Sequence, residues 1–163
     1  MSLRDDNEIT GRLTIRMHDA DGHVVEERRA NNAITFHGRE LVGRLFNHKA
    51  DLGKIPRVSR ICVGGSGRAF NPRDTDLAAP VGCTPIASVE EVETTDAEGR
   101  PRMMLRLTGE LGENDSNAEL SEAGLFTAPQ GNGDAGVMYN RVVFKPINKS
   151  AQFKLTLVWE ITF

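Results

Sequence analysis

Residues 152–163 read Gln-Phe-Lys-Leu-Thr-Leu-Val-Trp-Glu-Ile-Thr-Phe, and this stretch decides the fold class. Apolar side chains occupy every second position from Phe153 to Phe163, and polar side chains fill the gaps except at Val158. Successive side chains of a strand point to opposite faces, so the pattern predicts a half-buried β-strand with a continuous core face. Because this strand carries the only Trp of the chain, Trp159, we expect it at the centre of the fold.

Similar alternation recurs along the chain. Residues 9–17 alternate, an Asp-Gly pair at 21–22 signals a hairpin, and residues 24–30 are the expected return strand. That return strand is highly charged, which suits the edge of a sheet. Residues 80–85 are expected to be irregular. Further short strands are expected at 58–63, 86–93, 103–111, 120–127 and 137–144. The pattern predicts a mainly β protein, an antiparallel β-sandwich of about seven or eight strands.

A single helix is expected between the second and third strands. Thr35 is a suitable N-cap, and apolar residues from Phe36 to Phe46 follow at helical spacing. We predict one short α-helix at about 36–47, which covers one open face or end of the sheet.

The length of the chain predicts one folded domain at residues 9–163. Residues 1–8 are polar and acidic, and we expect a flexible N-terminal arm. Two interpretations of this arm are open: it orders on a partner copy, or it is a frayed terminus. The loop at 129–136 carries three glycines and is expected to be an exposed turn, with a partner contact as the alternative.

Charge and composition exclude several classes of protein. The chain has 20 basic and 23 acidic residues and a net charge of −3, which argues against a generic nucleic-acid binder. The basic pair Arg28–Arg29 is expected to be solvated surface. No apolar run approaches the ~20 residues of a membrane helix, and residues 1–8 hold no signal-peptide core. We therefore expect folding in the cytosol, with Cys62 and Cys83 as buried free thiols.

The strongest metal candidates flank the first hairpin turn. His18 and His23 could bind an ion together with Asp19 or Asp21. Exposed turn histidines are far commoner than such sites, so we predict no metal. Asp74 and Asp76 could be calcium ligands, but they lack the Gly and distal Glu of an EF-hand loop, and we expect them to form turns.

Residues 64–67, Gly-Gly-Ser-Gly, could cradle a phosphate only if a helix followed them. The sequence after them is not helical, so we predict a glycine-rich turn and no cofactor. Glu110, Glu113 and Asp115 are carboxylates near a strand end, and a solvated turn is the default interpretation. Cys62 lies in an apolar strand, which disfavours a reactive thiolate. We predict no catalytic residues and no enzymatic activity.

Three stretches resemble one family of proteins. The first is Asn31-Asn32-Ala33-Ile34 with His37-Gly38-Arg39-Glu40-Leu41-Val42-Gly43-Arg44-Leu45. The second is Ile61-Cys62-Val63-Gly64-Gly65-Ser66-Gly67 with Asn71-Pro72-Arg73-Asp74-Thr75-Asp76-Leu77. The third is Glu119-Leu120-Ser121-Glu122-Ala123-Gly124-Leu125-Phe126, followed by residues 144–150 and 157–161. Their order and spacing resemble small bacteriophage tail, collar and baseplate virion proteins, and the N-terminal domain of phage tail-collar fibre proteins.

This resemblance implies a structural component of a bacteriophage or phage-like contractile particle, in the tail, collar, neck or baseplate. It implies assembly with copies of itself, as a ring or other symmetric oligomer, and with other virion proteins. It implies no nucleic acid, membrane or small-molecule substrate as partner, and a location in the virion after assembly in the bacterial cytoplasm. Fibre proteins continue into a repetitive shaft that this sequence lacks, so we expect a ring, neck, baseplate or decoration component.

The alternative is a carbohydrate- or host-surface-binding β-sandwich used in attachment. Such a module would use exposed aromatic side chains. Aromatic residues are 6% of the chain, and most fall on predicted core faces. Tyr139 and Phe70 are the candidates left for an exposed binding platform.

Overall fold

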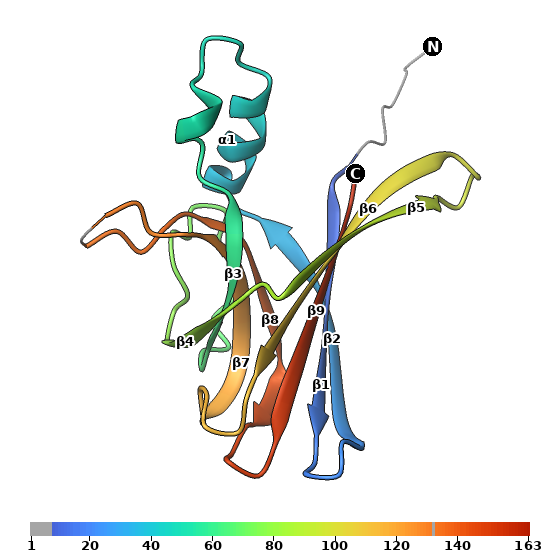
Figure 1. Cartoon of the computed structure of the whole chain (residues 1–163), viewed down its shortest axis with the longest axis vertical. Helices are drawn as coiled ribbons and strands as arrows, with labels where there is room; N and C mark the ends of the chain where they lie inside the picture. Colours follow the sequence, from blue (N-terminus) through green and yellow to red (C-terminus); the bar gives the residue numbers. More distant parts are fainter. Residues whose placement is uncertain (1–7, 132) are drawn as a thin grey trace.

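The computed structural model describes residues 8–131 and 133–163. The described strands form one antiparallel sheet that curls into a half-barrel, with a helix at one end (Figure 1). The elements are β1 Thr10–His18, β2 Val24–Ile34, α1 Phe36–Leu45, the 3-10 helix η1 Leu52–Lys54, β3 Val58–Gly64, β4 Pro80–Pro85, β5 Ser88–Thr95, β6 Pro101–Leu111, β7 Glu119–Thr127, β8 Met138–Asn148 and β9 Lys154–Thr162. Their order in the sheet is β4-β3-β7-β8-β2-β1-β9-β6-β5.

The prediction of a mainly β, antiparallel protein with one short helix is confirmed. The strand count differs, because the described chain holds nine strands and they are all connected in one sheet. Part of the difference is residues 80–85, which form β4 although both ends are proline. Among the described strands β4 pairs with β3 alone, and proline is tolerated at such a sheet edge.

One core joins the two halves of the curled sheet. Leu13, Leu107 and Trp159 lie side by side on β1, β6 and β9. They belong to the same buried cluster as Ile61 of β3 and Leu125 of β7, from the other half of the sheet. Trp159 is 0% exposed, so the predicted inner face of the last strand is confirmed.

The two ends of the sheet are linked by the chain itself. Only residues 86–87 separate β4, which pairs with β3, from β5, which pairs with β6. The Ile86 amide donates to the Ser59 carbonyl and the Ala87 amide donates to the Thr108 carbonyl, at 2.9 and 2.7 Å. The bent segment therefore crosses from one half of the half-barrel to the other.

β2 lies inside the sheet, between β1 and β8, so its predicted place at an edge is wrong. The high charge of β2 is explained by a gap in its pairing with β8. In the described chain the β2–β8 pairs are limited to Ala33 and Ile34. Across this gap the Arg28 guanidinium donates to the Lys145 and Pro146 carbonyls, each at 3.1 Å. A side chain thus replaces missing backbone pairing, and Arg28 is not merely solvated.

The helix begins where the sequence predicts. Thr35 is the N-cap, and its hydroxyl accepts from the Gly38 amide at 2.9 Å. The same hydroxyl donates to the Met138 carbonyl at 2.7 Å, which fastens the helix start to β8. Gly38 lies directly on that strand, since a Cβ at this position would clash with the Tyr139 carbonyl oxygen.

We expect Gly38→Ala to lower the free energy of unfolding by about 2 kcal/mol or more, because the new methyl would push the helix off the strand. Gly43→Ala is the matched control, because a Cβ at Gly43 meets no atom within 4 Å. The control should be stabilising by about 0.5–1 kcal/mol, as expected for Gly→Ala in an exposed helix. Urea titration measures both changes, and equal effects of the two variants would contradict the close approach of helix and strand.

The two cysteines form a disulfide, so the prediction of free thiols is wrong. Cys62 of β3 and Cys83 of β4 are directly opposite in the strand register, with Cα atoms 3.9 Å apart. This pairing could not be predicted, because residues 80–85 do not have the alternating pattern of a strand. The bond ties the edge strand β4 to the body of the sheet.

Candidate functional site

The outer face of β2, β1, β9 and β6 is polar and carries a cluster of arginines. On β1, Leu13 and its inward-facing neighbours fill the core, which leaves Arg12, Thr14 and Arg16 on the outer face. The antiparallel register then places Glu160 of β9 beside both Arg12 and Arg106. The outer face therefore presents rows of side chains that run across the strands.

Two carboxylates on this face are each shared by two guanidinium groups. Glu160 contacts Arg12 at 2.6 Å and Arg106 at 3.2 Å. Glu27 contacts Arg16 at 2.9 Å and Arg29 at 2.8 Å. Each carboxylate forms a trio with its two guanidinium groups. Arg106 also pairs with Glu90 of β5 at 3.1 Å, so the four arginines face three carboxylates and the group keeps one positive charge in excess.

The carboxylates lie deeper than the guanidinium groups. The Glu160 and Glu27 side chains are 16% and 33% exposed, whereas those of the four arginines range from 37% to 63%. The hydrogen bond from Arg12 lowers the pKa of Glu160, and the one from Arg16 lowers the pKa of Glu27. Both carboxylates therefore stay ionised at neutral pH and hold the guanidinium groups toward solvent.

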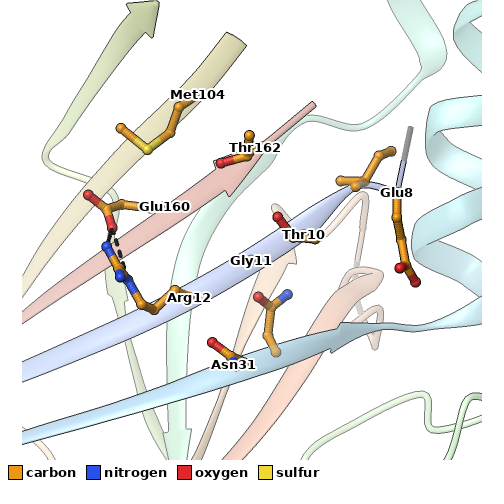
Figure 2. A pocket seen from close by; sticks show the side chains of 10 residues that line it. Glu8, Thr10, Gly11, Arg12, Asn31, Met104, Glu160 and Thr162 are labelled. Atoms are coloured by element: carbon orange, nitrogen blue, oxygen red, sulfur yellow. Dashed lines mark hydrogen bonds and ion pairs between the residues drawn. The ribbon is translucent and has the colours of Figure 1, made fainter. Parts of the chain in front are cut away.

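The two trios surround a shallow concavity of about 390 Å³, which we call the arginine groove. It is lined by the four arginines, Glu160, Thr14 and Val158. A second concavity of about 460 Å³, the end pocket, adjoins it and shares Arg12 and Glu160 (Figure 2). Figure 2 shows that the end pocket adds neutral polar side chains from Thr10, Asn31 and Thr162. The end pocket is also lined by Glu8, so the guanidinium groups lie mainly in the arginine groove and the neutral hydrogen-bonding groups in the end pocket.

A different surface, at the end of α1, is apolar. A groove of about 390 Å³, the helix-end groove, is lined by Leu41, Val42, Leu45, Leu52, Ile55, Pro56, Arg57, Val58 and Tyr139. Leu45 and Leu52 are 62% and 65% exposed, and the adjoining Phe46 is 85% exposed. Exposed apolar side chains that gather in this way mark surfaces for contact with other molecules.

A network of buried charges fixes the segment 65–79 onto the outer face of β7 and β8. Glu122 and Arg141 have fully buried side chains and form an ion pair at 2.8 Å. Glu122 accepts from the Ala78 and Ala79 amides at 3.0 and 2.7 Å. Arg141 donates to the Arg68 carbonyl at 2.8 Å and contacts Asp74 at 3.4 Å. This network stabilises the fold and is not open to a ligand.

The histidine candidates of the first turn separate in the structure. The two ring nitrogens of His18 contact the Thr156 hydroxyl at 3.1 Å and the Gly22 carbonyl at 3.4 Å, and His18 does not join the group formed by Asp19, Asp21 and His23. The ligand atoms of that group lie within 4.8 Å of one another. However, Asp19 accepts from the amides of Asp21 and His23 at 3.0 and 2.9 Å. The group has the contacts of a hairpin turn, and the prediction of no metal stays a prediction.

The glycine-rich loop leads from β3 into turns. After Gly64 the next regular element of the described chain is β4. Asp74 accepts from the Asn71 amide at 2.9 Å and pairs with Arg68 at 2.8 Å, and Asp76 accepts from the Leu77 amide at 2.7 Å. Both aspartates thus form turns, as expected.

The carboxylates near the end of β6 also serve a turn. Asp115 accepts from the Gly112 amide at 2.9 Å, while Glu110 and Glu113 are exposed. In the 129–136 loop, Asp134 accepts from the amides of Gln130 and Gly136 at 2.7 and 2.8 Å. The predicted N-terminal arm lies outside the described residues except for Glu8.

The prediction that Tyr139 is a candidate for an exposed aromatic platform that binds sugar is wrong. This side chain is 5% exposed, and burial raises the pKa of its hydroxyl. Its hydroxyl oxygen is buried and has no hydrogen-bond partner in the described chain. Phe70 is half-buried, so the two residues do not make an exposed pair.

Comparisons with known proteins leave the function to be argued from the residues. No protein-family model, no curated protein and no solved structure matches the chain. In the part of the chain that the structure describes, no helix has the length and apolar character needed to span a membrane.

Proposed function

We propose that the protein is a structural component of a bacteriophage or phage-like contractile particle, in the tail, collar, neck or baseplate. It acts by assembly with copies of itself and with other virion proteins, without catalysis. The observation that carries the proposal is the apolar surface at the helix end, the helix-end groove with Phe46 beside it. An exposed surface of this kind favours a lasting protein contact over a solvated end of a domain.

The positions of the three resembling stretches support this proposal. They are far apart in sequence but meet at one end of the sheet. The Phe36 amide, from the first stretch, donates to the Pro72 carbonyl of the second at 2.8 Å. The second and third stretches meet through Asp74, Glu122 and the intervening Arg141. Residues that resemble one family thus form one connected region next to the proposed contact surface.

We propose that the occupant of the helix-end groove is a second copy of the chain. Repeated copies of one chain usually close by symmetry, and one apolar patch that meets the same patch of a second copy is sufficient for a two-fold dimer. A larger ring would use a second, complementary surface as well. The helix-end groove also carries little charge, since Arg57 is the one charged residue among the described residues that line it. Contacts with other virion proteins would then use the remaining faces.

Light scattering behind a sizing column, at several protein concentrations, tests this assembly. We expect a closed oligomer for the unmodified chain and a shift toward monomer for the double variant Phe46→Ser/Leu52→Ser. Val89→Ser is the control, because Val89 is 60% exposed but lies on β5, away from the helix. A chain that stays monomeric at every concentration, or an oligomer that the control disrupts as strongly, overturns the proposal.

The second candidate function is attachment to a host-surface carbohydrate. Without a Tyr139 platform, this function would depend on charge and hydrogen bonds instead of aromatic stacking. The arginine groove and the end pocket are the observation that favours it.

A further inference from the structure

We propose that the arginine groove and the end pocket together bind an acidic polysaccharide, whose carboxylate or sulfate groups contact the four arginines and whose hydroxyl groups contact the end pocket. This inference does not depend on the assembly proposed above. It uses β1, β2, β6 and β9, whereas the helix-end groove uses α1, η1 and the residues between η1 and β3.

The charge distribution favours an anionic ligand. The lining of the arginine groove holds Arg12, Arg16, Arg29 and Arg106 together with Glu160. Glu27 and Glu90 pair with three of these arginines, so one positive charge is left in excess. Each guanidinium group has five N–H donors in a planar fork, so a group that already binds a carboxylate retains donors for another anion. The deeper position of the carboxylates leaves the guanidinium groups at the surface.

The geometry favours a polymer over a single small anion. Along β1, Arg12 and Arg16 are four residues apart, with Thr14 between them on the same face. At about 3.4 Å per residue their backbones are about 14 Å apart, further than one carboxylate or sulfate group can bridge. Arg29 lies opposite Thr14, and Arg106 lies two strands from Arg12. The guanidinium groups are therefore distributed both along the strands and across them.

The neutral residues favour a sugar over a nucleic acid or an acidic peptide. The end pocket presents the hydroxyls of Thr10 and Thr162 and the amide of Asn31 between Arg12 and Glu8. Neutral donors and acceptors beside a carboxylate suit sugar hydroxyls, whereas the acidic groups of the ligand contact the arginine groove. Among the described residues that line the two hollows none is aromatic, so single-stranded nucleic acid would find no stacking platform. The net charge of −3 also disfavours nucleic acid.

Isothermal titration with heparin fragments of defined length, at several salt concentrations, tests the site. Heparin serves as the probe because it carries both sulfate and carboxylate groups. The double variant Arg29→Gln/Arg106→Gln removes one guanidinium from each trio and leaves Glu27 and Glu160 one arginine each. Glu90, which loses Arg106, is 60% exposed to solvent, so the variant should fold normally. We expect it to weaken binding about tenfold at low salt and to reduce the slope of log Kd against log salt by about two, as for other polyanion contacts.

Two further variants separate the groove from general charge effects. Arg44→Gln/Arg73→Gln changes the net charge equally at exposed positions outside the groove and should leave the affinity within about twofold. Glu27→Gln frees two guanidinium groups and should tighten binding about threefold, whereas Glu113→Gln, on an exposed turn, should not.

The inference is overturned by the absence of heparin binding at low salt, or by equal weakening in the control double variant. It is also overturned if oligothymidine or polyglutamate of matched charge binds as tightly as heparin, since the ligand would then not be a polysaccharide. Preference for heparin, lost only with the groove arginines, supports it.

Discussion

Glu122→Gln is expected to lower the free energy of unfolding by about 3–5 kcal/mol, the usual loss when one partner of a buried ion pair is removed. The glutamine keeps the shape of the side chain but leaves Arg141, which is fully buried, with a charge that only the more distant Asp74 opposes. It also weakens the acceptor of the Ala78 and Ala79 amides, so the segment 65–79 loses part of its attachment. Urea titration monitored by the fluorescence of Trp159 measures the loss.

A double-mutant cycle separates the contribution of the ion pair to stability from the contribution of packing. Glu122→Gln combined with Arg141→Met should cost less than the sum of the two single variants, because no uncompensated charge remains inside. Glu113→Gln, an exposed carboxylate-to-amide change, is the control and should change stability by less than about 0.5 kcal/mol. Additive costs in the cycle, or a loss below about 1 kcal/mol for Glu122→Gln, would show that the pair does not hold this segment.

Trp159→Ala is the second large effect, with an expected loss of about 3–5 kcal/mol. The indole is 0% exposed and lies between Leu13 of β1 and Leu107 of β6, so its removal leaves a cavity where the two halves of the sheet meet. Circular dichroism during urea titration measures the loss, since the variant has no Trp fluorescence.

Trp159→Phe is the matched control for this cavity. The indole N–H has no hydrogen-bond partner within the described residues, so phenylalanine gives up volume but no hydrogen bond. We expect less than about half the loss of the alanine variant. A loss below about 1 kcal/mol for Trp159→Ala would mean that the inner face of β9 is assigned wrongly.

Local patterns in the sequence predicted the elements that have a clean period. The alternation in β9, the Asp-Gly turn between β1 and β2, and the Thr35 cap of the helix are all short-range signals, and each is found in the structure. Residues 80–85 gave no such signal, and β4 forms because β3 offers an edge and Cys62 a partner for Cys83. The disulfide was therefore hidden by the same residues that hid the strand.

The candidate site depends on register, which a single strand does not reveal. Arg12, Arg16 and Glu160 were recognisable as outward-facing residues on their own strands, but their meeting depends on which strands are neighbours. Glu122 lies in the apolar stretch of β7, and it is buried because a distant loop covers the outer face there. The periodicity of the β7 sequence does not indicate that a distant loop covers its outer face.

The pairing of β1 with β9 sets the timing of folding during synthesis. Arg12 and Glu160 are 148 positions apart, so β1 waits for almost the whole chain before its second neighbour leaves the ribosome. Until then the inner face of the β1–β2 hairpin, with Leu13, Ile15 and Met17, has no core to join. Contacts of such long range make folding slow, and the incomplete sheet is the stage at which this chain is most exposed to aggregation and most dependent on chaperones.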